Sequence, residues 1–505
     1  QLYFKLLDTQ VAGAETHREL MAGLPPLASG GTARRNRSAV KEASAELVKA
    51  IQTRRNLEAL AELPAGGLVD GDKLLAQIKP ALDKMPDHQA APAAFAVAQQ
   101  YARRGQWPLA RETFAMLAER YPAHPLAADA CRWIIRHDSS SEARRRYDLK
   151  QFITFTNLKF DVKQPPTGGA DTIVPGKVTF GPEKQKRTNF NPPEVVGEVK
   201  QMRFVPSDSA ATARQWYQGS LDTEKRLAAF GPLFAADPSI QFCLHAARRS
   251  LGDFDTPHAW YSDFASRQPD GPWRSAAQAE LWLANRSGLP PKPVGVCRLI
   301  DAKPFLDGKL DDACWRSVPT MLLKNAVGDT AKDYPTEAWL AYDSDFLYLA
   351  LRCRHPADRY VAPIKGRPRD ADLRAYDRVG LMLDLDRDYS TYYHFQVDQR
   401  GCVCDDCWGD LGWNPRWFVA VHSDETSWQI EAAIPLTELT SEKLSIGKAW
   451  AFNVVRVLPG RGVQAYSIPA DVQPRPEGMG LLMLAAEERA AGSQATKPFP
   501  MQTVP

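Results

Sequence analysis

The sequence predicts a multidomain protein of the α + β class, with helices first and an antiparallel β-sandwich at the C-terminal end. A chain of 505 residues is too long for one hydrophobic core. Apolar residues recur at helical spacing in much of residues 1–289, whereas residues 297–488 alternate apolar and polar residues between polar turns. Helices and strands that are segregated along a chain favour α + β over a βαβ sheet.

Composition sets limits on location and partners. The net charge of +3 does not indicate the strongly basic surface that binds nucleic acid. No run of apolar residues approaches the ~20 residues of a membrane-spanning helix. The eight cysteines are an even number, as in many exported proteins. The chain begins without Met, so we expect that a signal peptide has been removed and that the protein is secreted, periplasmic or at the cell surface.

The first helical region, residues 1–146, contains a helix pair between residues 93 and 136. Its pattern of Gly, aromatic, apolar and Pro positions returns later in the chain with the same internal spacing. The aligned positions are Gly105, Trp107, Phe114, Leu117, Pro122 and Pro125 with Gly252, Phe254, Tyr261, Phe264, Pro269 and Pro272. Pro257 stands where the first unit has the small Ala110, so the second unit is degenerate.

These helix pairs resemble tetratricopeptide repeats. Because such pairs bury their faces against neighbours, we expect further helices at 39–63, 70–82 and 210–234, with a second helical region spanning 210–289. The resemblance implies a concave surface that binds a protein partner. A helical spacer that only carries the next domain is an equally good interpretation.

Two segments between these regions have other patterns. Residues 147–209 predict an extended Pro-rich arm, with a strand at 152–160. Residues 290–296 predict a stiff Pro-rich linker, and 489–505 a flexible tail.

The C-terminal domain, 297–488, contains a regular series of predicted strands with polar hairpin turns between them. The predicted strands are 337–342, 346–353, 378–385, 392–397, 417–422, 428–434 and 450–458.

An ordered set of motifs in this domain resembles the family 9 carbohydrate-binding modules. It opens with Leu306-Asp307-Gly308 and Trp315 and continues through 338–342, 377–385, 427–436 and 453–456. The resemblance implies a β-sandwich, carbohydrate as the ligand and a structural calcium ion.

The loop between 402 and 417 contains candidate sugar-binding residues. Trp408, Trp413 and Trp417 lie among Gly and Asp residues, as in an aromatic platform, although each could instead belong to the core. We expect Arg378, His394 and Arg456 to contact sugar hydroxyls, with a purely structural role as the alternative for each.

Two clusters are candidate metal ligands. Asp384, Asp386 and Asp388 alternate at a strand end and suit calcium, although a solvated turn has the same pattern. The second cluster is Cys402, Cys404 and Cys407, whose thiols could bind zinc with Cys353 or His394, or form a disulfide.

No catalytic motif is present: the sequence has no nucleophile elbow, zinc-protease helix, phosphate loop or dinucleotide fingerprint. The sequence therefore predicts a noncatalytic protein that binds carbohydrate, carried on a helical scaffold. One alternative is a structural subunit whose sandwich contacts protein. Another is a haem-binding redox subunit.

Overall fold

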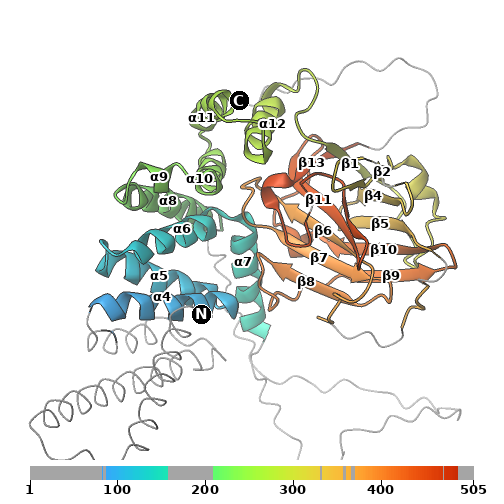
Figure 1. The fold of residues 1–505 in the computed structure, drawn as a ribbon, viewed down its shortest axis with the longest axis horizontal. Coiled ribbons are helices and arrows are strands. Elements are labelled where there is room, and N and C mark those ends of the chain that lie inside the picture. Colours follow the sequence, from blue (N-terminus) through green and yellow to red (C-terminus); the bar gives the residue numbers. More distant parts are fainter. Residues whose placement is uncertain are drawn as a thin grey trace, which may run out of the picture.

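A computed structural model describes residues 87–156, 209–329, 332–356, 360–364, 370–469 and 471–486, together with Leu82. In Figure 1 the helices lie on one side and a large sheet on the other. The expected helices at 39–63 and 70–81 and the predicted tail at 489–505 fall outside the described residues. Within the described residues, no helix combines the length and apolarity needed to cross a membrane.

The first helical unit consists of α4 (Asp87–Arg103), α5 (Trp107–Arg120) and α6 (Pro125–Ser139). Gly105 joins α4 to α5 with φ +67°, a left-handed conformation that glycine adopts without steric cost. Alanines of α4 let α5 pack closely, and Phe114 and Tyr101 fill the space between the helices. Pro125 begins α6, where its missing N–H would have no partner in any case.

The second helical unit repeats this order of features. It consists of α8 (Ser209–Ala228), α9 (Pro232–Ala235), α10 (Pro238–Ser250), α11 (Asp255–Arg267) and α12 (Pro272–Asn285). Gly252 joins α10 to α11 at φ +90°, and Pro272 begins α12. Two of the aligned pairs, Gly105 with Gly252 and Pro125 with Pro272, thus occupy equivalent places, whereas Trp107 is buried and its counterpart Phe254 is 65% exposed.

Helix α7 (Ser141–Thr156) corrects the predicted boundary of the arm. The arm was expected from residue 147 and a strand at 152–160, but the helix continues to Thr156. The Ser140 hydroxyl accepts a hydrogen bond from the Ala143 N–H and so caps the helix start, a local signal that outweighs the β-prone residues near its end. The rest of the arm, 157–208, lies outside the described residues.

The strands of the described C-terminal region form one mixed sheet rather than two antiparallel sheets. Its order is β8-β7-β6-β11-β13-β1-β4-β5-β10-β9, with β12 on β11 and β3, and β2 on β4. Strand β1 (Val294–Leu299) is parallel to both of its neighbours, which the prediction of an antiparallel domain did not include. The other strands are β2 (Met321–Leu322), β3 (Lys324–Asn325), β4 (Thr336–Tyr342), β5 (Phe346–Arg354), β6 (Arg378–Asp384), β7 (Tyr393–Asp398), β8 (Val403–Cys407), β9 (Phe418–Ser423), β10 (Ser427–Pro435), β11 (Ala449–Leu458), β12 (Gly462–Ala465) and β13 (Gly480–Ala485).

The seven predicted strands all exist and correspond to β4, β5, β6, β7, β9, β10 and β11. Their alternation was a strong signal because one face of each is buried in a shared core. Strand β8 was missed, since its cysteines and aspartates are poor strand formers. It pairs with β7 at the edge of the sheet.

Glu431 of β10 holds the opening motif of the domain on the face of the sheet that points away from the shared core. We call this face the outer face. The buried Glu431 carboxylate accepts hydrogen bonds from the backbone N–H groups of Asp307 and Gly308 at 3.2 and 3.0 Å. It also accepts one from the Trp315 indole at 2.8 Å. The motif thereby covers an apolar patch that includes Trp339 and Tyr348.

Another part of the outer face is covered by the second helical unit. Met382 of β6 and Tyr392 pack in one cluster with Phe242 and Tyr261 of the helices. The Pro-rich linker takes part as well, because Lys292 is buried and donates to the carbonyls of Glu477 and Met479. The second helical unit and the linker are therefore both packed against the sheet.

Candidate functional site

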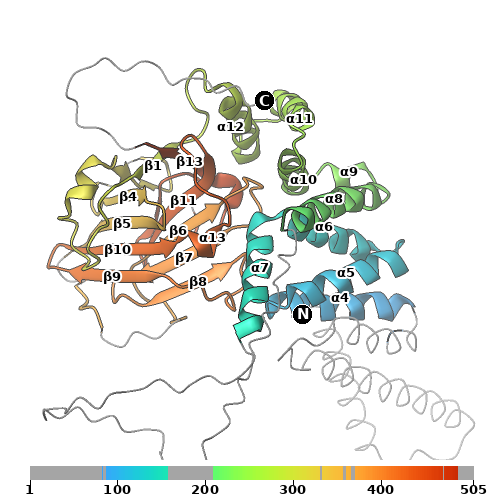
Figure 2. The same ribbon diagram turned by 180° about the vertical axis from the view of Figure 1, so that it is seen from behind.

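Helix α7 and the loop after β6 bring four carboxylates together at the junction of helices and sheet. In Figure 2 this helix lies between the first helical unit and the sheet, close to α13 (Leu436–Leu439). Of the predicted calcium ligands, Asp384 is the last residue of β6 and Asp386 and Asp388 lie in the loop that follows, while Glu142 comes from the first turn of α7. Oxygen atoms of Glu142, Asp384 and Asp386 all lie within 4.8 Å of one another.

Hydrogen bonds hold Glu142 in place. Its Oε1 accepts from the Leu385 N–H at 2.7 Å, and its Oε2 accepts from the Ser141 hydroxyl at 3.1 Å. The Thr391 hydroxyl lies 3.4 Å from the same Oε2. The N-terminal end of α7 adds its positive dipole, which favours a carboxylate here.

The loop carboxylates are held by backbone N–H groups. Asp384 accepts from Asp388 and Tyr389, and Asp388 accepts from Ser390 and Thr391. Asp386 Oδ2 accepts from the Ser141 N–H at 2.7 Å, which joins the loop to α7. Asp386 Oδ1 is buried and has no hydrogen-bond partner among the described residues.

Burial and the repulsion of neighbouring carboxylates make Glu142, Asp384 and Asp388 hard to ionise. The pKa values of Glu142 and Asp384 are raised well above their ordinary values, first by burial and then by the neighbouring carboxylates. Burial and Asp386 raise the pKa of Asp388 to about 7. A bound cation would remove the repulsion and supply Asp386 Oδ1 with a partner. Calcium takes six to eight oxygen ligands, so this oxygen-only cluster fits it.

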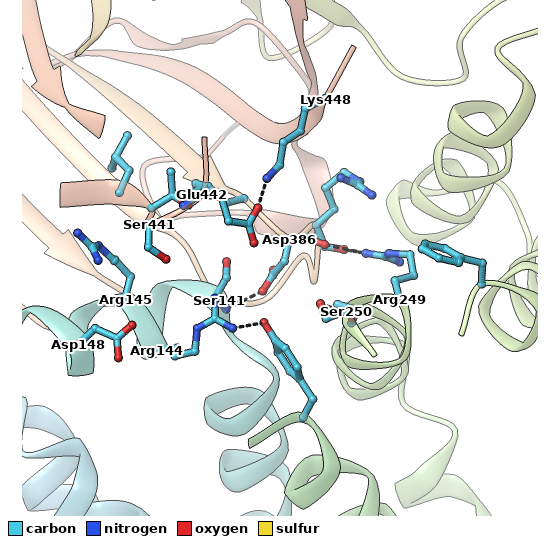
Figure 3. Close-up of a pocket in the computed structure, with 17 residues that line it drawn as sticks. Ser141, Arg144, Arg145, Asp148, Arg249, Ser250, Asp386, Ser441, Glu442 and Lys448 are labelled. Carbon is cyan, nitrogen blue, oxygen red and sulfur yellow. Dashed lines mark hydrogen bonds and ion pairs between the residues drawn. The ribbon is translucent and has the colours of Figure 1, made fainter. Parts of the chain in front are cut away.

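A hollow of about 200 Å³ lies beside this cluster. Asp386 belongs to the cluster and also lines the hollow. We call it the junction hollow (Figure 3). Its walls come from α7, α8, the end of α10, and the loops after β6 and α13. The labelled side chains converge on it from these elements, and they include Arg144, Asp148, Ser250 and Ser441.

The side chains of the junction hollow offer donors, acceptors and one exposed ring. Arg144 donates to the Tyr217 hydroxyl at 2.9 Å, and Lys448 pairs with Glu442 at 2.5 Å. Burial raises the pKa of Asp148, and Arg144 opposes that shift. Phe254 lines the hollow and is 65% exposed.

The predicted tryptophan platform does not form an open surface in the structure. Trp413 is buried and stacks on Tyr393 with the ring centroids 4.7 Å apart. Trp417 is half-buried, and its indole N–H donates to Asp405 at 3.0 Å. Both rings pack against Phe395 of β7. These two indoles therefore occupy core positions, which was the alternative for each, and their role in sugar binding stays a prediction.

Trp408 packs against the helical region instead of facing solvent. Its ring lies 5.7 Å from that of Trp107 and 5.6 Å from that of Trp133. Arg146 of α7 forms a buried ion pair with Asp410 of the same loop and stacks on Trp107. The Trp-rich loop thus joins the sheet to the first helical unit.

The three polar residues predicted to bind sugar separate into two places. Arg456 is fully buried and pairs with Asp377, its Nε 2.9 Å from Oδ1. Arg378 and His394 line one shallow hollow of about 20 Å³ on the outer face of the sheet. There His394 lies over Gly380 and pairs with Asp406 at 3.0 Å. Arg456 therefore exposes no atom that a sugar hydroxyl could contact.

The three cysteines of the second cluster do not gather. Neither they nor the other five cysteines, all of which lie within the described residues, form a disulfide. Cys407 of β8 points into the core, and Cys404 lies on the opposite face of the same strand because side chains alternate. That alternation leaves Cys404 and Cys407 unable to share a zinc ion or a disulfide in this strand.

Sequence analysis missed the contribution of the helical regions to the junction. Glu142 is separated from Asp384 by nearly half of the chain, so no local pattern connects them. The one available signal was Ser140-Ser141-Glu142, which is typical of a helix start. Phe254 was noted only as an aligned position of the repeat.

No protein-family model matches the chain, and no curated protein does. Among solved structures, the chain is similar to a family 9 carbohydrate binding module from Caldicellulosiruptor kristjanssonii in complex with cellotriose. The identity is 16% and the TM-score 0.30, over 41% of this chain and 100% of that one. The same module in complex with glucose gives 16% and 0.30, over 39% of this chain and 100% of that one.

Proposed function

We propose that this protein is a noncatalytic carbohydrate-binding protein whose sugar site is the junction hollow. The observation that carries the proposal is an exposed phenyl ring, Phe254, on a hollow lined by hydroxyl, guanidinium and carboxylate groups. The ordered motifs of the C-terminal domain favour the same ligand class. The hollow has room for one small polar ligand, such as a single sugar ring.

The chemistry of the lining suits a sugar. A pyranose presents hydroxyl groups around its edge and C–H groups on its faces. Arg144, Asp148 and Ser441 are the donors and acceptors for the hydroxyls, and Phe254 offers an apolar face for the C–H groups.

The carboxylate cluster next to the hollow is, in this proposal, a structural calcium site. Glu142, Asp384 and Asp386 would hold the ion, and Asp388 would hold the loop that presents two of them. The ion would neutralise carboxylates that now repel one another and would fix α7 against the sheet. In this proposal the protein is secreted, periplasmic or at the cell surface, and the site binds calcium at about 10⁻⁴–10⁻³ M, as sites in extracellular modules commonly do.

The test is a glycan array with the full chain, followed by calorimetry with the glycan that binds. We expect Phe254→Ala and Asp148→Asn each to weaken binding about tenfold, which corresponds to about 1.4 kcal/mol. Phe305→Ala is the matched control, because Phe305 is another exposed phenyl ring, 75% accessible and outside the hollow.

A folded protein that binds no glycan would contradict the proposal and favour the structural-subunit alternative. Glycan binding that is lost with Phe305→Ala but kept with Phe254→Ala would keep carbohydrate as the ligand and reject the junction hollow as its site.

A further inference from the structure

A second hollow lies on the first helical unit, away from the residues that line the junction hollow. It has a volume of about 460 Å³ and is lined by α4, α5 and α6. We call it the α4–α6 hollow. Phe95, Phe114 and Trp133 form an aromatic wall, with 5.5 Å between the first two ring centroids and 4.9 Å between the last two. Phe95 and Trp133 are only half-buried, so ligand could contact their rings.

Three guanidinium groups line the same hollow. Arg132 already pairs with Asp129 at 3.5 Å and Asp237 at 3.3 Å. Arg103 is exposed, and Arg136 donates to the Ser239 hydroxyl at 2.8 Å. Across the part of the chain that the structure describes, neither Arg103 nor Arg136 has a carboxylate within ion-pair distance. The hollow therefore presents two positive charges that have no ion pair among the described residues, beside an aromatic wall and the paired charges of Arg132 and Asp129, which also lines it.

Hydrogen bonding points to a missing acceptor as well. The Nε–H groups of Arg132 and Arg136 are buried, and neither has a partner within the described residues. Leaving a buried donor unpaired carries a free-energy cost, because the donor has lost its hydrogen bonds to water. A ligand with carboxylate or carbonyl oxygens would recover that cost, whereas a cationic ligand would add repulsion.

We propose that the α4–α6 hollow binds an acidic peptide segment of a partner protein, with an apolar side chain against the aromatic wall and carboxylates on Arg103 and Arg136. The volume exceeds that of the junction hollow and accommodates several side chains. Charge complementarity selects an acidic segment. The site is independent of the proposed sugar site, and it gives the expected protein partner a place and a chemistry.

The test uses the full chain and two fluorescein-labelled probes. The first is the peptide Glu-Glu-Phe-Glu-Glu-Ala, and the second replaces every Glu with Lys. Fluorescence anisotropy should show saturable binding of the acidic peptide and none of the basic peptide. Its affinity should fall as salt rises, because the unpaired charges are partly exposed.

The double variant Arg103→Gln/Arg136→Gln should weaken acidic-peptide binding at least tenfold. The control Arg267→Gln/Arg374→Gln also removes two positive charges, but from exposed positions that do not line the hollow, and should leave binding unchanged. Arg103→Gln alone, at an exposed position, should weaken binding severalfold without affecting folding.

Two outcomes of the peptide comparison would overturn the proposal, and one outcome of a truncation would do so as well. One is equal binding of the acidic and basic peptides, or no binding of either. The other is an equal loss of affinity in the hollow variants and in the control, which would reveal only a general response to net charge. If the acidic peptide binds only after residues 1–81 are removed, the hollow is occupied by this chain itself and not by a partner.

Discussion

Trp408 lies in a loop at the edge of the sheet and packs against the helices. A tryptophan in a Gly- and Asp-rich loop is typical of a ligand platform, and this one has φ +50°, which is unusual for a bulky residue. Its ring nevertheless packs between Trp107 and Trp133 of the helices. The backbone conformation therefore serves an intramolecular contact, and binding tests that remove this ring also weaken the fold.

Replacing Trp408 with Ala should destabilise the protein by about 2–4 kcal/mol, because the ring is lost from a packed aromatic cluster. Chemical denaturation followed by circular dichroism measures the change. Trp408→Phe should keep much of the packing, and Phe305→Ala should stay within about 0.5 kcal/mol of the parent protein. A Trp408→Ala protein as stable as the parent would show that the ring does not join the two regions.

Gly308 offers a prediction with a closely matched control. It has φ +84°, and a Cβ there would lie 2.5 Å from the backbone nitrogen of His422. Gly460 has φ +75° but open space around it. Gly460→Ala should therefore cost only the left-handed backbone, about 1–2 kcal/mol. Gly308→Ala should cost more, since the backbone must also move. Equal losses in thermal unfolding would contradict the close approach.

Residue types at the site were predictable, but their partners were not. The aspartates at 384, 386 and 388 indicated a cation site from the sequence alone. The fourth carboxylate of the cluster, Glu142, could be identified only from the fold. Arg456 was expected to face a ligand, but it is fully buried and pairs with Asp377. The sequence motif contains the arginine but does not show that a carboxylate from another segment neutralises its charge.

At the scale of elements, strands were predictable where apolar residues at every second position face the shared core. Strands β5 and β10 match the predicted ranges closely because their alternation follows the core. Strand β1 was not predicted, and part of it was assigned to the Pro-rich linker. Its six residues directly follow a Pro-rich run, and their pairing partners, β13 and β4, are distant in the sequence. Long-range parallel pairing leaves no local signal.

The contact between α7 and the sheet should depend on pH. The pKa values of Glu142, Asp384 and Asp388 are raised in the folded protein, so the folded state binds protons more tightly than the unfolded state. Stability must then fall as pH rises through the folded pKa, which for Asp388 is about 7. In metal-free protein, the melting temperature should be lower at pH 8 than at pH 6.

Glu142→Gln should reduce that pH dependence, because one of the repelling carboxylates is gone. Asp372→Asn serves as the control, since Asp372 is exposed and pairs with Arg374 outside the cluster. An unchanged slope of melting temperature against pH in Glu142→Gln would show that the cluster does not control it.

Calcium should reverse the loss of stability at pH 8. An ion that binds only the folded state at 100 times its dissociation constant adds about 2.7 kcal/mol. We therefore expect calcium to raise the melting temperature by several degrees in the parent protein and in Asp372→Asn. Asp386→Asn should respond much less, since Asp386 supplies the buried oxygen without a partner. Equal shifts in all three proteins would point to calcium binding elsewhere.

At the scale of the whole molecule, the helices and the sheet share their cores. The first unit meets the sheet region through Trp408, and α7 meets it through the Arg146–Asp410 ion pair. The second unit covers Met382 and Tyr392. The sequence suggested separate domains joined by a stiff linker, because contacts between distant segments are invisible to local patterns. Both hollows therefore belong to one packed body, and a site at the junction exists only while the two regions stay together.

This arrangement predicts that residues 294–486 alone are less stable than the full chain. Removing the helices exposes Trp408, Met382 and Tyr392 at once, an apolar surface that monomeric domains rarely leave uncovered. Calorimetry should show a lower melting temperature for the fragment, and the fragment should bind the dye ANS where the full chain does not. A fragment that melts with the full chain and binds no dye would make the helices a passive carrier. The junction hollow would then be a contact surface between two independent domains.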